Sequence, residues 1–263
     1  MRTGNREEVK NIFLGGQCIC KIANREDLYI IISGPAYRDM TPRQLKGIGK
    51  YPQEKEKIFI WLTNVFEKYF HDDVKNVEEF DKWHNKVCKD ICEQFKERCH
   101  VDLKYGKAQK IVNMSFKNFY CFDDAEEYED YFTCCHMPID SYTLSWFKRV
   151  VCNNMKVYSW SNLQYQDYIE IQNKIRDYLN SDKNQTYLDE TGCPLTSLIT
   201  EFYIWPEEQF RKPCIQWLDK VNKLTDYSSC SDKELLDYME QIHIKTEILI
   251  DKLRNAKISE FEI

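Results

Sequence analysis

The sequence predicts a mainly all-α protein, and three observations support that fold class. The chain of 263 residues contains only 8 glycines and 7 prolines, whereas a β-sandwich or barrel needs a turn after every strand. A chain of this length can bury a sizeable core in one large domain or two intimate subdomains, and aromatic residues are plentiful at 14%. Apolar residues also recur at helical spacing over long stretches. We therefore expect helices packed around a common core.

The first predicted element is a short apolar run, Leu28–Ile32, which indicates one strand or a buried extended segment ending at Ser33-Gly34-Pro35. Helical periodicity dominates after it. One helix is predicted from the apolar series Ile58, Trp61, Leu62, Val65, Phe66 and Tyr69, and the next from Val77, Phe80, Trp83, Val87, Ile91 and Phe95.

Two capping boxes predict where later helices begin. Ser161 with Gln164 precedes one apolar series, and Ser231 with Glu234 precedes another. The two series are Tyr165, Tyr168, Ile169, Ile175 and Leu179, and Leu235, Tyr238, Met239, Ile242, Leu249 and Leu253. The acidic stretch 123–130 and the polar stretch 180–191 are expected to be connections.

The composition favours a cytoplasmic protein without a membrane partner. No stretch reaches the ~20 consecutive apolar residues of a membrane-spanning helix, and residues 1–8 lack the apolar core of a signal peptide. In that setting the 12 cysteines are expected to remain reduced.

Two groups of residues have a spacing that suits metal ligands. Cys18 and Cys20 form a CxC pair without a matching second pair, while His84, Cys88 and Cys92 recur every four residues on one helix face. That face is otherwise apolar, with Trp83, Val87, Ile91 and Phe95. Since buried cysteine behaves as a small hydrophobe, we favour a plain core face and predict neither a metal nor a cofactor.

The net charge of −6 argues mildly against a nucleic-acid partner, but phosphate contacts are local, so the distribution of charge matters more. Residues 103–117 contain no acid and four lysines: Lys104, Lys107, Lys110 and Lys117. Within this basic segment, Gly106 precedes a helical run. It predicts a tight turn at a helix N-terminus, where backbone N–H groups bind a phosphate.

A second polar motif, Pro138-Ile139-Asp140, follows the basic segment. Proline followed two residues later by aspartate is a favourable start for a helix, because the aspartate can cap its N-terminus. The carboxylate of Asp140 is therefore expected at a fixed position.

Together these motifs resemble the active-site region of helix-hairpin-helix DNA glycosylases. Gly106-x-Ala108-x-Lys110 is similar to the family's Gly-x-Gly-x-Lys hairpin, with alanine in place of the second glycine. Pro138-Ile139-Asp140 is similar to its Pro-Val-Asp, and Arg149 falls where several members also have arginine. The interval from Lys110 to Asp140 is most similar to the archaeal 8-oxoguanine DNA glycosylase branch. The likeness covers roughly residues 103–151, under a fifth of the chain.

The resemblance implies a helix-hairpin-helix bundle of two intimate helical subdomains with the active site in the cleft between them. Residues 54–151 would form the hairpin-containing catalytic part of a single unit, 1–263, and residues 1–53 with 152–263 the packing part. It also implies a monomer that acts on double-stranded DNA with an oxidised or otherwise modified base.

The implied chemistry needs the target nucleotide flipped out of the duplex while phosphate contacts hold the backbone. Lys110 would attack the sugar C1′ and form a Schiff base that permits strand cleavage. Burial and a nearby helix N-terminus would favour loss of its proton. Asp140 would accept that proton or stabilise positive charge on the sugar, so the two side chains must converge in a cleft.

The remaining site residues implied by the resemblance bind the DNA or the base. Contacts with the DNA backbone are expected from Gly106, Lys107, Ala108, Gln109, Lys117 and Arg149. The candidates for the base pocket are His136, Tyr142 and Trp146. For the aromatic residues the alternative is a place in the core, and for His136 a structural hydrogen bond.

A second glycine motif lies at Leu45-Lys46-Gly47-Ile48-Gly49-Lys50. Pro52 follows at once, Tyr51 stands where the lysine should be, and no Pro-x-Asp follows at a suitable distance. It predicts either a second clamp on the DNA backbone or a turn before the next helix, and we favour the turn.

Two other classes of function compete with the glycosylase. A non-catalytic helix-hairpin-helix nucleic-acid-binding protein would need the hairpins but not Asp140. A helical protein-interaction module is favoured by the acidic total and the 17 tyrosines, and it predicts no salt-dependent binding to DNA.

Overall fold

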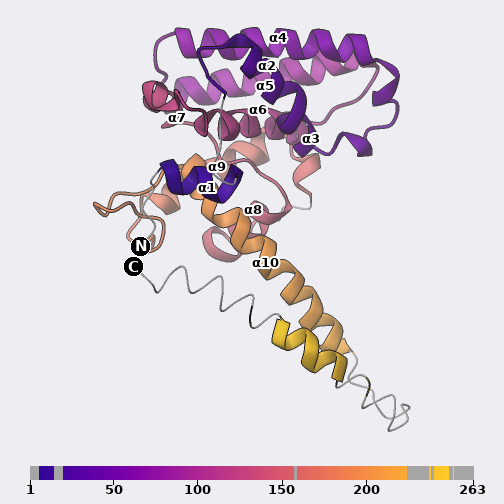
Figure 1. The fold of residues 1–263 in the computed structure, drawn as a ribbon, viewed down its shortest axis with the longest axis vertical. Coiled ribbons are helices and arrows are strands. Elements are labelled where there is room, and N and C mark those ends of the chain that lie inside the picture. The colour runs from indigo at the N-terminus through magenta and orange to yellow at the C-terminus, as the bar shows by residue number, and fades with distance from the viewer. Residues whose placement is uncertain are drawn as a thin grey trace. The chain divides into compact units, whose positions relative to one another are not determined.

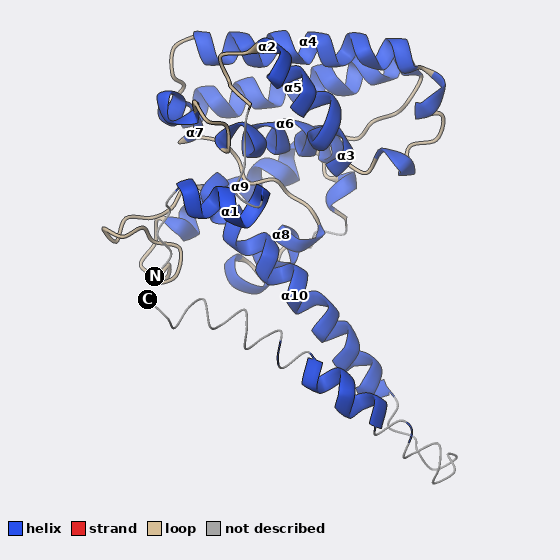
Figure 2. Ribbon diagram, in the orientation of Figure 1, coloured by secondary structure: helices blue, strands red, loops and turns tan. Residues whose placement is uncertain are grey.

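The structure is a computed structural model that describes residues 6–14, 20–156, 159–223, 237, 240–248 and 251. The chain divides into two compact units, Met1–Ile204 and Trp205–Ile263. The described residues form helices and no strand, which confirms the all-α prediction (Figure 2). The subdomain limits expected at residues 54 and 151 stay a prediction.

The first unit holds most of the helices, and α10 continues into the second (Figure 1). The longer ones are α1 (Arg6–Leu14), α2 (Arg25–Ile31), α4 (Pro52–His71), α5 (Val77–Cys99), α6 (Tyr105–Tyr120), α9 (Tyr165–Leu179) and α10 (Ser197–Lys223). Shorter segments are η1 (Ile32–Ala36), α3 (Tyr37–Asp39), η2 (Pro42–Gln44), η3 (Ile48–Lys50), η4 (Ala125–Tyr128), α7 (Glu129–Phe132), α8 (Ser141–Trp146), η5 (Phe147–Val151) and η6 (Trp160–Asn162).

Three helices of the first unit, α4, α5 and α6, lie side by side, with α4 at the outer edge of the view (Figure 1). The apolar spacing that predicted α4 and α5 is confirmed by their buried faces. The ring of Phe66 on α4 meets the rings of Phe116 and Phe119 on α6 edge-on, with centroids 5.0 and 5.1 Å apart. Every residue of α6 is buried, so this helix is the axis of the core.

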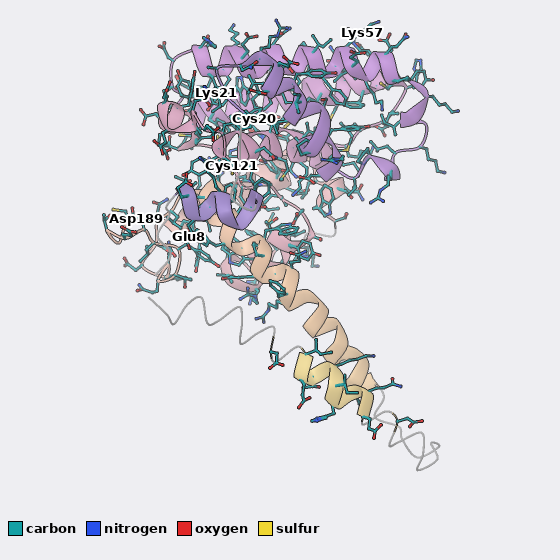
Figure 3. All side chains as sticks on the ribbon, viewed as in Figure 1. Glu8, Cys20, Lys21, Lys57, Cys121 and Asp189 are labelled. Carbon is teal, nitrogen blue, oxygen red and sulfur yellow. The ribbon has the colours of Figure 1, made fainter. Side chains whose placement is uncertain are left out.

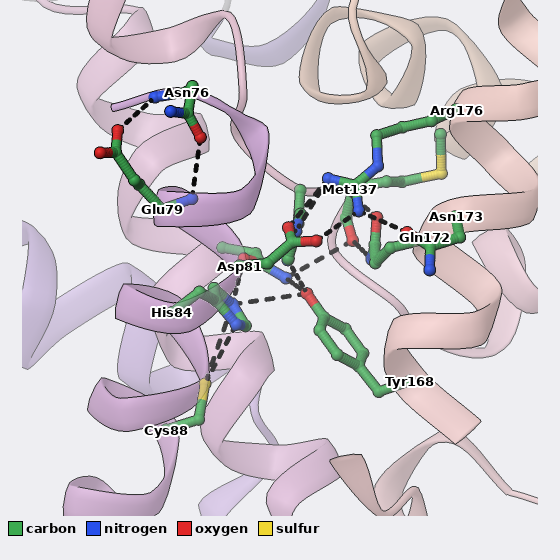
Figure 4. Close-up of polar contacts among 12 residues, drawn as sticks. Asn76, Glu79, Asp81, His84, Cys88, Met137, Tyr168, Gln172, Asn173 and Arg176 are labelled. Carbon is green, nitrogen blue, oxygen red and sulfur yellow. Dashed lines mark hydrogen bonds and ion pairs between the residues drawn. The ribbon is translucent and has the colours of Figure 1, made fainter. Parts of the chain in front are cut away.

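The hairpin between α5 and α6 has its turn at His100. Helix α5 begins with a capping box between Asn76 and Glu79 (Figure 4), and it ends at His100, whose φ of 53° is left-handed. Gly106 is not in this turn, as the sequence had suggested, because it is already the second residue of α6. Its small size serves packing instead, since a Cβ there would overlap the carbonyl oxygen of Trp160 in η6.

Leu28–Ile32 is helical, so the predicted strand is wrong. The Asn24 side chain accepts a hydrogen bond from the Glu26 amide and starts α2, which runs on into the π-helical η1. Leu28 and Ile32 are buried while Ile30 is 49% exposed. A spacing of four between buried residues is one helical turn, and the run of consecutive apolar residues hid this periodicity.

The predicted capping box at Ser161 is also wrong. Ser161 lies inside η6, and α9 begins after Gln164 without a side-chain cap. The second predicted box, at Ser231 and Glu234, lies outside the described residues. The stretch 180–191 is a connection, as expected, whereas 123–130 contains η4 and the start of α7.

The surface of the first unit carries exposed ion pairs, such as that of Lys57 with Glu54 on α4 (Figure 3). Among the described helices, none combines the length and the apolar character that a membrane crossing requires.

We predict that Gly106→Ala destabilises the protein. In an ordinary helix this change is stabilising by about 1 kcal/mol, but here the new methyl group meets the backbone of Trp160, and overpacking costs about 1–3 kcal/mol. Urea unfolding measures the difference. The matched control is Gly49→Ala, also in a helical segment (η3) but with open space around the new methyl, and it should leave stability equal or higher. Equal effects of the two changes would contradict the packing role of Gly106.

Candidate functional site

The structure brings Lys110 and Asp140 into contact. The Nζ atom of Lys110 on α6 donates a hydrogen bond of 2.8 Å to Oδ2 of Asp140. The side chains are 5% and 13% exposed, respectively, so the pair lies just beneath the surface. The two residues thus converge as the predicted mechanism requires, while their catalytic roles and the cleft stay predictions.

Asp140 is fixed by its place at the start of α8. Its Oδ1 accepts hydrogen bonds from the amides of Tyr142 and Thr143 at 2.8 and 3.1 Å, and its own amide donates to the Thr143 hydroxyl. This is the N-cap that the sequence predicted. One carboxylate oxygen therefore holds the helix, and the other faces Lys110.

Further charged groups surround this pair. The ammonium group of Lys117, two turns along α6, forms a buried ion pair with Glu201 of α10. Asp39, at the end of α3, interacts electrostatically with Lys110, Lys117 and Asp140. We call these five residues the charged cluster: two ammonium groups and three carboxyl groups from α3, α6, α8 and α10.

The cluster keeps Lys110 charged in the resting protein. Burial by itself lowers the pKa of Lys110, but the carboxylates of Asp140, Glu201 and Asp39 outweigh it, and the net pKa is above the ordinary value. Burial raises the pKa of Asp140, yet Lys110 and the amides of its helix lower it overall. The pair is therefore an ammonium and a carboxylate, contrary to the expectation that burial would release the lysine proton.

Gln109 holds the segment before Asp140 against α6. Its side-chain nitrogen donates to the carbonyl oxygen of Ile139 at 2.7 Å, and its oxygen accepts from the Ile139 amide at 3.2 Å. Gln172 of α9 makes the same pair of bonds to Met137, at 2.8 and 3.2 Å. Because Gln109 precedes Lys110 and Ile139 precedes Asp140, the Gln109 amide sets the position of Lys110 relative to Asp140.

A buried hydrogen-bond network supports these glutamines (Figure 4). Asn113 donates to Gln109 at 2.9 Å and to the Tyr168 hydroxyl at 2.8 Å. The Tyr168 hydroxyl lies 2.8 Å from Nδ1 of His136, and Nε2 of His136 lies 2.7 Å from Asp81. Arg176 closes the network at its outer end with two bonds to Asp81 (Figure 4).

His136 is a neutral member of this network. Burial lowers its pKa and outweighs the effect of Asp81. Its bonds are satisfied when Nε2 donates to Asp81 and Nδ1 accepts from Tyr168. Burial raises the pKa of Asp81, but hydrogen bonds from His136 and Arg176 lower it to about 2. The ring is 1% exposed, which fits the structural alternative for His136 rather than contact with a base.

Most residues expected at the DNA backbone lie inside the protein. The Lys107 ammonium, on a side chain at 6% exposure, donates to the carbonyl oxygen of Met40 and the hydroxyl of Thr41 at 2.8 and 2.9 Å. Gly106, Ala108, Gln109 and Lys117 are likewise buried. This structure therefore offers no phosphate contact at these five positions, because their polar groups are bonded within the protein. Arg149, in η5, is exposed.

The three candidates for the base pocket differ in how far they are buried. Trp146 is completely buried, and its Nε1 donates to the Tyr187 hydroxyl at 2.9 Å, so it belongs to the core. Tyr142 is partly exposed and follows Asp140 by two residues, which leaves it as the candidate beside the pair.

The core-face interpretation of the His84 stripe is confirmed. His84 and Cys88 are completely buried, and the Nε2 atom of His84 lies 2.9 Å from the side-chain oxygen of Asn113. In the described residues no three His, Cys, Asp or Glu side chains are arranged to hold a metal ion.

Three residues hold the segment before Asp140 by hydrogen bonds, and the sequence interpretation did not assign this role to them. They are Gln109, Asn113 and Gln172. A detectable sign was present: amide side chains occupy positions within otherwise apolar helix faces, and buried amides need internal partners. Asp81 and Arg176 carry no such sign, because they are 95 positions apart and look like ordinary surface charges.

Compared with known protein families, characterised proteins and solved structures, the chain matches none.

We predict that stability falls with acidification below about pH 6.5. Burial lowers the pKa of both His84 and His136, so the folded protein keeps them neutral while the unfolded chain binds a proton at each. Each histidine then contributes a slope approaching about 1.4 kcal/mol per pH unit. The stabilisation from Asp81 is lost only below about pH 4. Burial raises the pKa of Glu201 and of Asp39, which adds a slope of opposite sign, and the comparison with His136→Gln cancels it. Urea unfolding across this range measures the slope, and His136→Gln should make it shallower. An unchanged slope in that variant would contradict a neutral His136.

We predict that Lys110→Met destabilises the protein by about 3 kcal/mol or more, because a buried carboxylate loses its partner. Adding Asp140→Asn, which retains the N-cap, should recover part of that loss as a coupling of about 1–3 kcal/mol. Urea unfolding of the two single variants and the double variant measures it. Lys57→Met breaks an exposed pair with Glu54 and should cost less than about 1 kcal/mol. Strict additivity at Lys110 and Asp140 would refute the pairing.

Proposed function

We propose that this chain is a DNA glycosylase with lyase activity, which excises an oxidised or otherwise modified base through a Schiff base on Lys110. The observation that carries the proposal is the 2.8 Å contact between Lys110 and Asp140, the two residues that the sequence predicts to be catalytic. A nearly buried lysine beside a carboxylate fixed at a helix N-terminus suits this chemistry.

The chemistry begins from a charged lysine, so the proton must leave during the reaction. As the bond between C1′ and the base nitrogen breaks, the base takes the electron pair and a proton from Lys110, relayed by Asp140. The Lys110 Nζ atom then forms its bond to C1′. Opening of the sugar ring, with a proton moving from Nζ to the ring oxygen, leaves a protonated Schiff base.

The charged cluster supports this role in a second way. The sugar becomes positively charged as the base leaves, and preorganised carboxylates stabilise such charge most strongly where water is excluded. Asp140 is the carboxylate in contact with the lysine, and Glu201 and Asp39 add negative potential at Lys110.

We predict that the protein forms a covalent adduct with DNA when borohydride is present. Duplexes with 8-oxoguanine, uracil or an abasic site are incubated with the protein, and the adduct is detected by its shift in a denaturing gel. Lys110→Gln should abolish it, and Asp140→Asn should slow it by roughly 100-fold. Lys104→Gln, an exposed lysine of the same basic segment, is the control and should retain it.

Absence of an adduct and of base release on all three duplexes would refute the proposal. An adduct that survives in Lys110→Gln, with folding confirmed by circular dichroism, would place the nucleophile elsewhere.

A further inference from the structure

An exposed basic loop begins beside the charged cluster. The loop, residues 41–51, contains Arg43, Lys46 and Lys50, all exposed, and residues 40–53 contain no acid. Within the described part of the chain, none of these three cations takes part in an ion pair. They stand out in a protein whose net charge is −6.

The loop is anchored at both ends to the site and its hairpin. At its start, the Lys107 ammonium bonds to Met40 and Thr41, and Lys107 lies one helical turn before Lys110 on α6. At its end, the ring of Tyr51 packs edge-on against His100, the turn residue between α5 and α6, with centroids 5.5 Å apart. The loop is thus held against α6 at its start and against the turn between α5 and α6 at its end.

Between its ends the loop presents apolar residues to the protein and cations to solvent. Leu45 and Ile48 are partly buried against the core, while each of the three cations projects outward. Two 3₁₀ turns, η2 and η3, shape the backbone, and Gly47 between them has a left-handed φ of 82°. This pattern leaves the positive charge of the loop exposed to solvent.

The backbone of the loop is also accessible. A Cβ at Gly49 would meet nothing within 4 Å, and the φ of Gly49 is not positive, so neither packing nor conformation requires glycine there. A glycine without such a requirement leaves room for a ligand to approach the main chain closely. Thr41 is one of the described non-glycine residues with a left-handed φ, 57°, a strained conformation of the kind that occurs at ligand sites.

We infer that this loop, rather than the start of α6, binds the phosphate backbone of duplex DNA. The inference rests on the proposed function for its choice of ligand. The lysines of α6 lie at 3–6% exposure with internal partners, whereas Arg43, Lys46 and Lys50 offer free cations and an open backbone beside the same site. Such contacts position a duplex without reading its sequence.

The test is binding of an undamaged, fluorescent duplex, measured by anisotropy at several salt concentrations. The triple variant Arg43→Gln/Lys46→Gln/Lys50→Gln should bind at least tenfold more weakly. Its slope of log affinity against log salt should fall by about 0.9 for each lost phosphate contact. The control triple, Lys82→Gln/Lys86→Gln/Lys174→Gln, removes the same charge from exposed pairs on α5 and α9 and should keep the wild-type slope.

Unchanged binding in the loop triple, equal losses in the two triples, or no binding by the wild type would each overturn the inference. These outcomes need no chemistry, so they are separate from the adduct formed by the wild-type protein. A wild type that binds through the loop but forms no adduct would refute the glycosylase and leave the loop as a nucleic-acid site.

Discussion

The structure depends on the burial of α6, a helix that is inaccessible along its whole length and yet carries three lysines and several amides. A buried polar group without a partner costs several kcal/mol, so each side chain must bond within the protein. Gln109 donates a hydrogen bond to the carbonyl oxygen of Ile139, and Lys110 donates one to the carboxylate of Asp140. Lys107 donates to the carbonyl oxygen of Met40. These partners lie in separate segments of the chain. The hydrogen bonds that the polar side chains of α6 require therefore fix the positions of those segments around the helix.

This arrangement explains why carboxyl groups from three other elements, Asp39, Asp140 and Glu201, gather around the lysines of α6. Each lysine on the buried helix needs at least one acceptor of its own, and Lys110 has three carboxyl groups in its field. Replacing such a pair with apolar side chains often stabilises a protein. Stability alone therefore does not explain two lysine–carboxylate pairs beside each other.

Helical periodicity was sufficient to predict α4 and α5, because one apolar face alternates with a charged one. It failed at Leu28–Ile32, where consecutive apolar residues concealed the helical spacing of those that are buried. The site was predictable only in its two central residues. A segment with four lysines and no acid looks exposed, and nothing local reveals that Glu201 reaches Lys117 from 84 positions away. Burial of charge is decided by tertiary partners, so the basic segment was wrongly expected at the surface, whereas the contact between Lys110 and Asp140 was predicted.

In the two proposals, DNA binding and catalysis use different charged groups, the loop cations and the charged cluster. The sequence alone did not suggest this separation. The carboxylates of the charged cluster repel a polyanion at close range, whereas in the proposed reaction they stabilise a sugar that becomes cationic as its base departs. Binding therefore needs cations that lie outside the cluster but stay fixed relative to it. The hydrogen bond from Lys107 to Thr41, at the start of the basic loop, supplies that connection. It joins the loop with its exposed cations to α6, the helix that bears Lys110. Attraction of the backbone and stabilisation of the reacting sugar then belong to different elements, the loop 41–51 and the charged cluster around α6.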